Sequence, residues 1–333
     1  MAQRDEDRTA PARTWRGGMA SGCSDAPCAD DEQEPLQLQP ATKVGIRSSR
    51  RSRWCCFFIL IIICFGFLVD SFRCTFPVHR TGAILVTGCD HEESLGAAVA
   101  KSLALMGFTV FVTVRRDSGV ALWKDTHRIV PLLLPDVSDD AAVRAMFVSL
   151  NTTLTRLTMP LVGVINNAGV MRGHALKDTS AADLRQVFGT NVFGLMYVTR
   201  EALPLLPRGG RVVNVGSLLG RVGLPNVNPY GASKWAVAGI SDSLRREVSR
   251  HEIAVSLVEP GFFASAMCDP KQSHYCKTVG PEETAEATVH AVTSCRPRKY
   301  YQTAGAMGAP TWLVLWFLQW TPTGIVDWMI GKL

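Results

Sequence analysis

The sequence predicts an α/β fold, a doubly wound parallel sheet of the Rossmann type in a single domain spanning residues 81–333. Three observations predict it. A short apolar run leads directly into a glycine loop and a helix, further apolar runs alternate with helical stretches, and no internal repeat divides the segment. Strands that are apolar on both faces are typical of parallel sheets covered by helices.

The first apolar run, residues 83–87, is followed at once by Gly88. Residues 96–106 then have a helical pattern that ends before Gly107. This order predicts a βαβ opening, in which the helix N-terminus near Gly96 holds a nucleotide pyrophosphate. Further strands are predicted at residues 109–114, 129–134, 161–165, 211–215 and 255–258.

A tyrosine and a lysine form the main chemical signal. Tyr230 and Lys234 stand four residues apart, and Ser217 comes soon after the predicted strand at residues 211–215. Because positions i and i+4 share a helix face, the Lys234 ammonium can lie beside the phenol and lower its pKa toward the working pH. A general base needs such a pKa, and Ser217 would donate to a substrate oxygen. An exposed aromatic beside a solvated lysine is the alternative for the bare pattern.

Several short motifs occur in a specific order along the chain. They are Thr87-Gly88, Asp136-Val137, Asn166-Asn167-Ala168-Gly169, Asn191, Ser217, Tyr230 with Lys234, and Pro260-Gly261. In this order they resemble the short-chain dehydrogenase/reductase family over roughly residues 81–333. Within the family, the chain looks most like the membrane-bound retinol dehydrogenases and 17-beta-hydroxysteroid dehydrogenases, and the 3-hydroxybutyrate dehydrogenases are a near alternative.

The resemblance implies an NAD(P)-dependent oxidoreductase that interconverts a hydrophobic alcohol and its ketone or aldehyde, with a retinoid or steroid as substrate. Tyr230 would transfer the hydroxyl proton while hydride moves to or from the nicotinamide. Lys234 would lower the pKa of Tyr230 and hydrogen-bond the ribose. Ser217 would hold the substrate oxygen, and Asn191 would hold a water that links Lys234 to solvent.

The resemblance also implies a set of cofactor-binding residues, with Asn166 to Gly169 on the adenosine side and Asp136 at the adenine edge. Pro260-Gly261 with Ser265 would flank the nicotinamide carboxamide. The full set is Thr87, Gly88, Ser94, Gly96, Arg115, Arg116, Asp136, Val137, Asn167, Ala168, Gly169, Tyr230, Lys234, Pro260, Gly261 and Ser265.

NADP(H) is favoured as the cofactor, and NAD(H) is the alternative. An NAD enzyme carries an acid about 20 residues past the glycines for the ribose 2′-hydroxyl. Here the second strand ends in Arg115-Arg116, and Asp117 comes two residues late. Guanidinium groups suit a 2′-phosphate better than a free diol.

The glycine loop departs from the family pattern. It has two extra residues, Ser94 stands where the middle glycine is usual, and Glu92-Glu93 add negative charge. One interpretation is an insertion that bulges into solvent and leaves the helix N-terminus free. The other is a catalytically weakened, membrane-tethered member that acts as a lipid-binding or scaffold protein.

A second strong signal is the uncharged run of residues 54–69, which favours a single-pass signal anchor over a buried helix or a cleaved signal peptide. Residues 41–53 carry five of the chain's net +6 charges, which indicates positive-inside orientation rather than nucleic-acid binding. This predicts a disordered cytosolic tail at residues 1–53 and a lumenal enzyme domain, in the endoplasmic reticulum.

The C-terminal region predicts a helix near residues 311–321 with Trp312, Trp316 and Trp320 on one face. It either packs on the core or contacts membrane lipid.

No metal site is predicted, because Cys268, His274 and Cys276 lack a fourth ligand, and a disulfide joining the two cysteines is the better alternative. The surrounding loop, with Phe262, Phe263, Met267 and Tyr275, is where substrate contacts are expected. The oligomeric state is left open, with a homodimer as one option.

Overall fold

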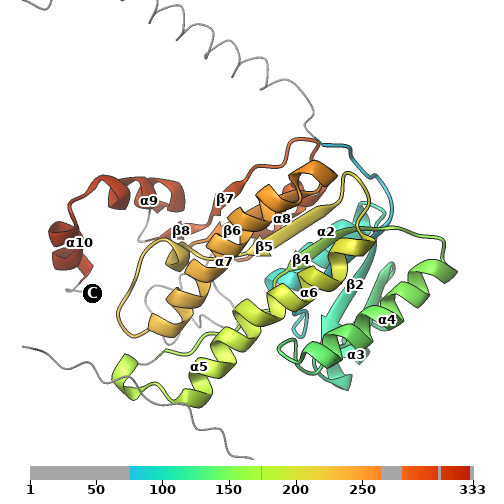
Figure 1. Cartoon of the computed structure of the whole chain (residues 1–333), viewed down its shortest axis with the longest axis horizontal. Coiled ribbons are helices and arrows are strands. Elements are labelled where there is room, and N and C mark those ends of the chain that lie inside the picture. Colours follow the sequence, from blue (N-terminus) through green and yellow to red (C-terminus); the bar gives the residue numbers. More distant parts are fainter. Residues whose placement is uncertain (1–75, 174, 264–279, 307–308, 331–333) are drawn as a thin grey trace, which may run out of the picture. The chain divides into compact units, whose positions relative to one another are not determined.

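The structure, a computed structural model, describes residues 76–173, 175–263, 280–306 and 309–330 (Figure 1). Several of the sequence-based predictions lie outside these residues. They are the tail and anchor at residues 1–69, the role of Ser265, the substrate contacts of Met267 and Tyr275, and the metal or disulfide alternatives at residues 268–276.

Seven parallel strands form the central sheet, in the order β3-β2-β1-β4-β5-β6-β7 (Figure 1). The predicted doubly wound sheet is confirmed, and a seventh strand joins the six that were expected. The chain runs outward in one direction from β1 and in the other from β4, and a ligand site is expected at such a switch point, beyond the carboxyl ends of the strands. The strands are β1 (Ala83–Val86), β2 (Thr109–Val114), β3 (Ile129–Leu133), β4 (Leu161–Asn166), β5 (Arg211–Val215), β6 (Ala254–Pro260) and β7 (Tyr300–Thr303).

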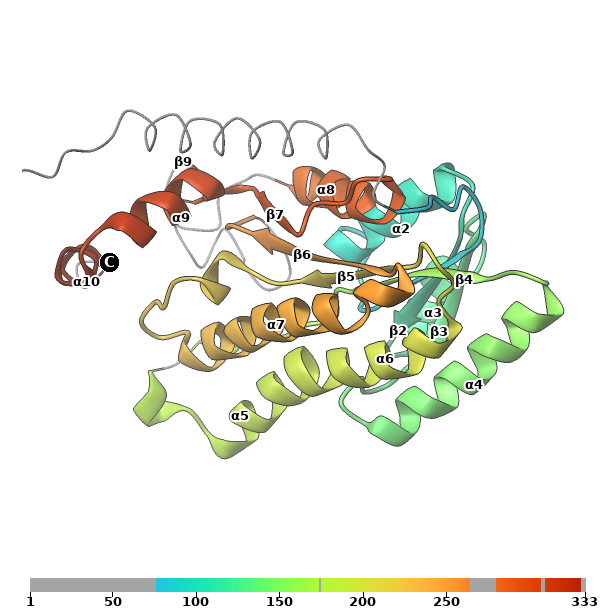
Figure 2. The same ribbon diagram turned by 45° about the horizontal axis from the view of Figure 1, so that its top comes forward.

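Helices cover both faces of the sheet (Figure 2). One layer holds α2 (Leu95–Leu105), α3 (Asp117–Trp123) and α8 (Glu282–Thr293). The other holds α4 (Asp140–Arg156), α5 (Ala181–Phe188), α6 (Leu195–Ala202) and α7 (Asn228–Glu247).

Strand β1 shows why the strands read as unbroken apolar runs. Ile84 and Val86 pack in the core under α2 and α8, whereas Ala83 and Leu85 pack in the core under α4 and α6. Successive side chains of a strand point to opposite faces, so a strand buried on both faces needs apolar residues at every position.

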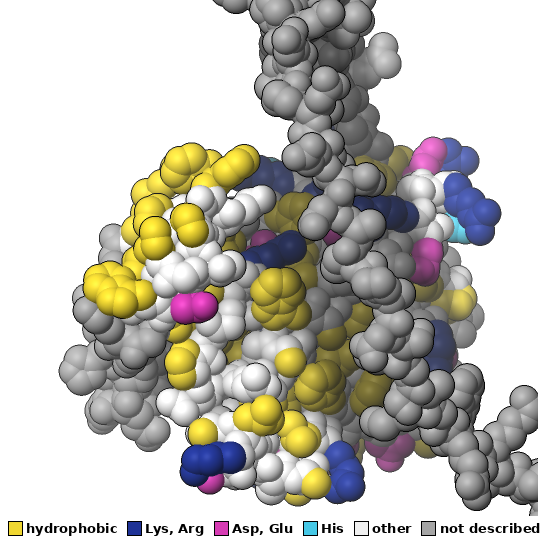
Figure 3. All heavy atoms as spheres, turned by 60° about the vertical axis from the view of Figure 1, so that its left-hand side comes forward, with side chains coloured by type: hydrophobic (Ala, Val, Ile, Leu, Met, Phe, Trp, Pro, Cys, Tyr) yellow, Lys and Arg dark blue, Asp and Glu magenta, His cyan; other side chains and the backbone are white. Residues whose placement is uncertain are grey.

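The C-terminal region continues through a short ribbon, β8 (Gly305–Ala306) with β9 (Ala309–Pro310), into α9 (Thr311–Trp320) and α10 (Thr323–Ile330). Trp312, Trp316 and Trp320 of α9 are 56%, 58% and 72% exposed. The core-packing alternative for this helix is therefore wrong. Ile325 and Trp328 of α10 are exposed as well, and Figure 3 shows hydrophobic side chains gathered on the side of the domain that carries these helices.

No helix in the described part of the chain is both long enough and apolar enough to cross a bilayer.

Candidate active site

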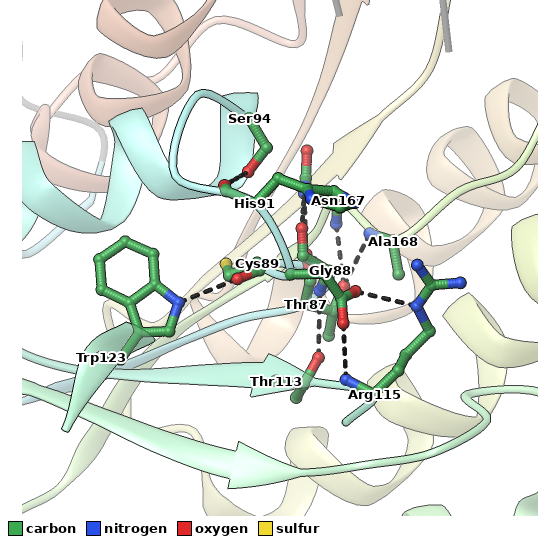
Figure 4. A network of polar contacts seen from close by, with 11 residues as sticks. Thr87, Gly88, Cys89, His91, Ser94, Thr113, Arg115, Trp123, Asn167 and Ala168 are labelled. Atoms are coloured by element: carbon green, nitrogen blue, oxygen red, sulfur yellow. Dashed lines mark hydrogen bonds and ion pairs between the residues drawn. The ribbon is translucent and has the colours of Figure 1, made fainter. Parts of the chain in front are cut away.

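The loops at the carboxyl ends of β1 and β4 meet through a set of short hydrogen bonds (Figure 4). Thr87 Oγ1 accepts from the backbone N–H groups of Asn167 and Ala168, each at 3.0 Å. The Asn167 side-chain amide donates in return to the carbonyls of Thr87, at 2.8 Å, and Gly88, at 3.1 Å. Four of the predicted cofactor residues thus form one rigid corner at the switch point.

The two glycines of this corner are required by packing. Gly88 has a φ of +75°, and a Cβ there would lie 2.8 Å from Ala168 Cα. A Cβ on Gly96 would lie 2.7 Å from the Asn167 amide nitrogen and 2.9 Å from Cys89 Sγ. The two loops can therefore pack this closely only because Gly88 and Gly96 have no side chain. This packing holds the N-terminus of α2 at the corner, as a dinucleotide pyrophosphate site requires. The residues present fit that group.

The inserted part of the loop turns outward. His91, Glu92 and Glu93 are exposed, and the Glu92 carboxylate pairs with Lys101 of α2 at 2.8 Å. Ser94 is the N-cap of α2, and its Oγ accepts from Ala97 N at 3.2 Å. Its backbone, at φ −77° and ψ 158°, is ordinary for any residue, so serine replaces the family's glycine without backbone strain.

The sequence did not indicate two residues that fix the loop, one on β2 and one in the loop itself. Thr113 of β2 accepts from Gly88 N at 3.0 Å. Asp90 accepts from Arg115 twice, from the backbone N–H at 2.7 Å and from Nε at 3.0 Å. The carboxylate of Asp90 therefore lies at the end of β2, although Asp90 comes from a loop 25 residues earlier in the sequence. The only sequence signal was an acid inside a glycine loop.

Three further residues were predicted to line the cofactor site. Asp136 is exposed, and its Oδ1 accepts from the N–H and the hydroxyl of Ser138. Val137 packs against the bare Cα of Gly194, where a Cβ would lie 2.8 Å from Val137 Cγ1. Asn166 was expected to line the adenosine side, but it is buried among core polar groups instead. Its amide donates to side chains on β5 and α6, those of Asn214 and Thr199.

The three predicted catalytic side chains Ser217, Tyr230 and Lys234 come together. Ser217 begins the short turn η4 (Leu218–Gly220) after β5, and Tyr230 lies in the first turn of α7. The Ser217 side chain interacts with the Tyr230 hydroxyl and lowers its pKa. Lys234 follows on α7 with its Nζ 5.6 Å from the centre of the Tyr230 ring. The alternative of an exposed pair is wrong, because Lys234 is only 5% exposed.

Burial governs the charges of this cluster. It raises the pKa of Tyr230 to about 12, although the hydrogen bond with Ser217 lowers that pKa. It also lowers the pKa of Lys234 to about 8. The structure differs here from the expected lowering of the tyrosine pKa by lysine. The ammonium lies over the ring and donates to the Val215 carbonyl at 2.8 Å, so desolvation outweighs it at the hydroxyl.

Asn191 lies in a π-helical turn, η2 (Gly189–Gly194), between α5 and α6. Its amide donates to the Val170 carbonyl and to Ser233 Oγ, both at 2.9 Å, and its Oδ1 accepts from Val170 N at 2.8 Å. The side chain therefore braces the loop after β4 against α7. Turns of this type are common at functional sites, and the water-holding role of Asn191 stays a prediction.

Pro260 ends β6, and Gly261 follows it beside the start of α9. Gly261 N donates to the Thr303 carbonyl at 2.8 Å. A Cβ on Gly261 would lie 2.6 Å from both the Gly305 carbonyl and Thr311 Oγ1. The segment proposed to flank a carboxamide is thus fixed by tight backbone packing.

The fold and this corner define a dinucleotide-binding domain of the Rossmann type. Residues 82–275 match the family model described as short chain dehydrogenase, which is more than half of the chain. The protein therefore belongs to the short-chain dehydrogenase family.

Two curated relatives show the range of the match. The mitochondrial D-beta-hydroxybutyrate dehydrogenase of Rattus norvegicus is 35% identical over 193 residues, which cover 55% of each chain. Dehydrogenase/reductase SDR family member 9 of Bos taurus is 33% identical over 219 residues, covering 65% of this chain and 67% of the relative. The chain thus spans between about half and two thirds of the length of these relatives.

Two solved structures share the fold. A gluconate 5-dehydrogenase from Burkholderia cenocepacia in complex with NADP and tartrate has a TM-score of 0.57 and 19% identity, over 66% of this chain and 90% of that one. A short chain dehydrogenase/reductase from Burkholderia phymatum in complex with NAD has a TM-score of 0.57 and 23% identity, over 67% of this chain and 88% of that one.

Proposed function

We propose that the protein is an NAD(P)-dependent oxidoreductase that interconverts a hydrophobic alcohol and its ketone or aldehyde. The observation that carries the proposal is the cluster of Ser217, Tyr230 and Lys234. The Ser217 side chain acts on the Tyr230 hydroxyl, and the Lys234 ammonium lies 5.6 Å from the centre of the Tyr230 ring. Such a cluster can hold a substrate oxygen and exchange its proton.

The pKa values of Tyr230 and Lys234 indicate the role of each side chain in this cluster. With a pKa of about 12, Tyr230 is protonated at neutral pH and can donate its proton to a carbonyl oxygen. Ser217 can donate to the same oxygen, and two oriented donors stabilise the charge that develops there. Lys234, with a pKa of about 8, is charged at neutral pH and stabilises the phenolate that proton donation leaves. A bound nicotinamide dinucleotide would supply the hydride chemistry.

The corner at the switch point would hold that dinucleotide. Gly88 and Gly96 let the backbone approach a pyrophosphate at the α2 N-terminus, and Asn167 to Gly169 stand on the neighbouring strand end. Across the site, Pro260-Gly261 lies at the carboxyl end of β6, which is next to β5 in the sheet.

NADP(H) is the proposed cofactor, because Arg115 and Arg116 are exposed at the end of β2 and can meet a 2′-phosphate. Asp90 weakens this preference, since it already binds Arg115 and is itself an acceptor for a ribose hydroxyl. NAD(H) is therefore the alternative, and the preference between the two cofactors depends on the ion pair of Asp90 with Arg115.

The proposed substrate is a retinoid or a steroid, and the proposed setting is a membrane. Helices α9 and α10 expose Trp312, Trp316, Trp320 and Trp328, and tryptophan side chains favour the interface of a bilayer. The apolar run at residues 54–69 would anchor the chain with the enzyme domain in the lumen of the endoplasmic reticulum.

The alternative function, a weakened member that acts as a lipid-binding or scaffold protein, rested on the altered glycine loop. Glu92 and Glu93 are exposed, and Ser94 caps α2 with an unstrained backbone. These observations favour the enzyme over the scaffold.

A titration tests the proposal. The full chain in detergent should show quenching of tryptophan fluorescence by NADPH or NADH at concentrations up to about 1 mM, the upper end of common KM values. Turnover is then followed at 340 nm with a panel of retinoid and steroid alcohols and carbonyl compounds. Binding of neither nucleotide would exclude the enzyme and leave the scaffold alternative.

A further inference from the structure

An ion pair between an arginine at the surface and a buried glutamate connects two parts of the site that are far apart in the chain. Arg221 directly follows η4, the turn that Ser217 begins. Its Nε lies 2.5 Å from Oε1 of Glu259, which immediately precedes Pro260-Gly261 in β6. The Glu259 side chain is 1% exposed and that of Arg221 is 34% exposed, so a buried carboxylate meets a guanidinium that reaches the surface.

The same arginine is connected to the helix that carries Tyr230. Its guanidinium lies over the Tyr300 ring of β7, 5.1 Å from the ring centre. The Tyr300 hydroxyl donates to Asp242 of α7 at 2.6 Å. One polar network therefore joins the Ser217 turn, the β6 end and α7.

The turn between these contacts has little freedom of its own. A Cβ on Gly220 would lie 2.8 Å from the Lys234 carbonyl, so η4 packs directly on the α7 backbone. Ser217 Oγ accepts from Leu219 N at 3.1 Å, which makes the position of the hydroxyl depend on the position of the turn. The contacts that hold the end of η4 therefore also affect the position of the Ser217 hydroxyl relative to Tyr230.

The energetics favour a strong restraint. A buried carboxylate is costly unless a cation with good geometry meets it, and removing one partner of such a pair leaves an uncompensated charge. Burial raises the pKa of Glu259, and the hydrogen bond and charge of Arg221 lower it. Loss of Arg221 would leave the Glu259 carboxylate buried without its cation, so the pair connects the η4 end to β6.

We propose that Arg221 and Glu259 are positioning residues that hold the Ser217 hydroxyl in place against Tyr230. This inference rests on the proposed function, and it adds two residues that touch neither the reacting oxygen nor the proton. Both act through Ser217, so their loss should change turnover and its pH dependence more than nucleotide binding.

The test compares Arg221→Met, Arg221→Lys and the double variant Arg221→Met with Glu259→Gln, each in the full chain in detergent. The single Met variant leaves a buried carboxylate alone and can be unstable. The double variant removes both charges and should recover the unfolding midpoint. A merely structural role predicts that turnover recovers with stability.

A positioning role predicts that kcat stays at least about tenfold lower in the double variant, with the nucleotide KM within about twofold of the wild type and Arg221→Lys in between. The pH profile of kcat should also move to higher pH, because the hydrogen bond that lowers the pKa of Tyr230 is weakened. A double variant with wild-type kcat and pH profile would overturn the proposal.

Hydrogen exchange without nucleotide provides a second readout. Peptides covering residues 217–222 should exchange faster in the double variant than in the wild type, whereas peptides of β1 and β4 should not change. Unchanged exchange at residues 217–222 would overturn the restraint itself. If the wild type neither binds nucleotide nor turns over, the proposed function fails, and exchange still decides whether the pair holds η4.

Discussion

Asp90 of the glycine loop accepts two hydrogen bonds from Arg115 at the end of β2, one from the backbone N–H and one from Nε. In Rossmann folds the end of the second strand is where the adenosine ribose is recognised, so under the proposed function a carboxylate and a guanidinium would both face that ribose. A 2′-phosphate would compete with Asp90 for Arg115, whereas a free 2′-hydroxyl would not.

Asp90→Asn should therefore raise the affinity for NADPH relative to NADH. Asparagine keeps an acceptor for the Arg115 N–H and loses the charge. Because partly exposed ion pairs contribute about 0.2–1 kcal/mol, the ratio of the two dissociation constants should change by up to about fivefold. Fluorescence titration with both nucleotides measures it. Glu93→Gln, a change of an exposed carboxylate in the same loop, is the control and should leave the ratio alone. A shift toward NADH in Asp90→Asn would contradict the prediction.

Ser94 offers a test of the altered loop. Ser94→Ala removes the N-cap of α2 and should lower the free energy of unfolding by about 1 kcal/mol, whereas Ser94→Gly should cost only a few tenths. Urea unfolding of the full chain in detergent compares them. Equal stability of all three proteins would show that the cap contributes nothing.

Tyr230→Phe should abolish turnover, by at least about a hundredfold, because the proton donor is lost while the ring remains. The dissociation constants of NADPH and NADH should stay within about twofold. Tyr197→Phe, on α6, removes a phenol hydroxyl elsewhere and should keep normal turnover. An active Tyr230→Phe enzyme would be incompatible with the mechanism.

The lowered pKa of Lys234 predicts that the free energy of unfolding depends on pH. Its pKa is about 8 in the folded protein, against an unfolded value of about 10.5. The unfolded chain therefore binds more protons between these values, and stability should rise as pH rises from 8 to 10.5. The penalty for charging the buried amine is fully present below pH 8.

Lys234→Met removes this titration. The free energy of unfolding of the wild type should rise relative to that of Lys234→Met by up to about 3 kcal/mol between pH 8 and 10.5. Urea unfolding at steps of half a pH unit measures the difference. A difference that stays flat over this range would mean that the amine titrates normally.

The orientation in the membrane can be tested with sealed microsomes. A protease added outside should trim only the residues before the apolar run at 54–69 and leave the folded domain whole. Detergent should then expose the domain to digestion. Loss of the domain in sealed vesicles would reverse the proposed topology.

Much of the fold was predictable because its signals are local. Apolar runs such as residues 109–114 are strands in the structure with the predicted bounds. The Gly96 helix begins one residue earlier than predicted, at Leu95, because Ser94 caps it. The seventh strand, β7, was missed, since residues 300–303 read Tyr-Tyr-Gln-Thr and only one face of the strand is buried.

The site was predictable in its residues and less so in its electrostatics. Spacing along a helix brought Tyr230 and Lys234 together, as expected. It carried no information about burial, which raises the pKa of Tyr230 instead of lowering it. Asn166 illustrates the same limit, because its neighbours in the sequence pointed to the adenosine side and its neighbours in space are core polar groups.

By itself the sequence determined the parallel sheet, which follows from periodicity, and the shared face of Tyr230 and Lys234, which follows from spacing within one helix. The order of its motifs indicated Ser217 and the residues of the glycine loop. Only the tertiary structure decided that Asp90 meets Arg115, that Arg221 meets Glu259, and that desolvation controls the charge of Tyr230. Contacts between distant segments, and the water that packing excludes, depend on how the elements assemble.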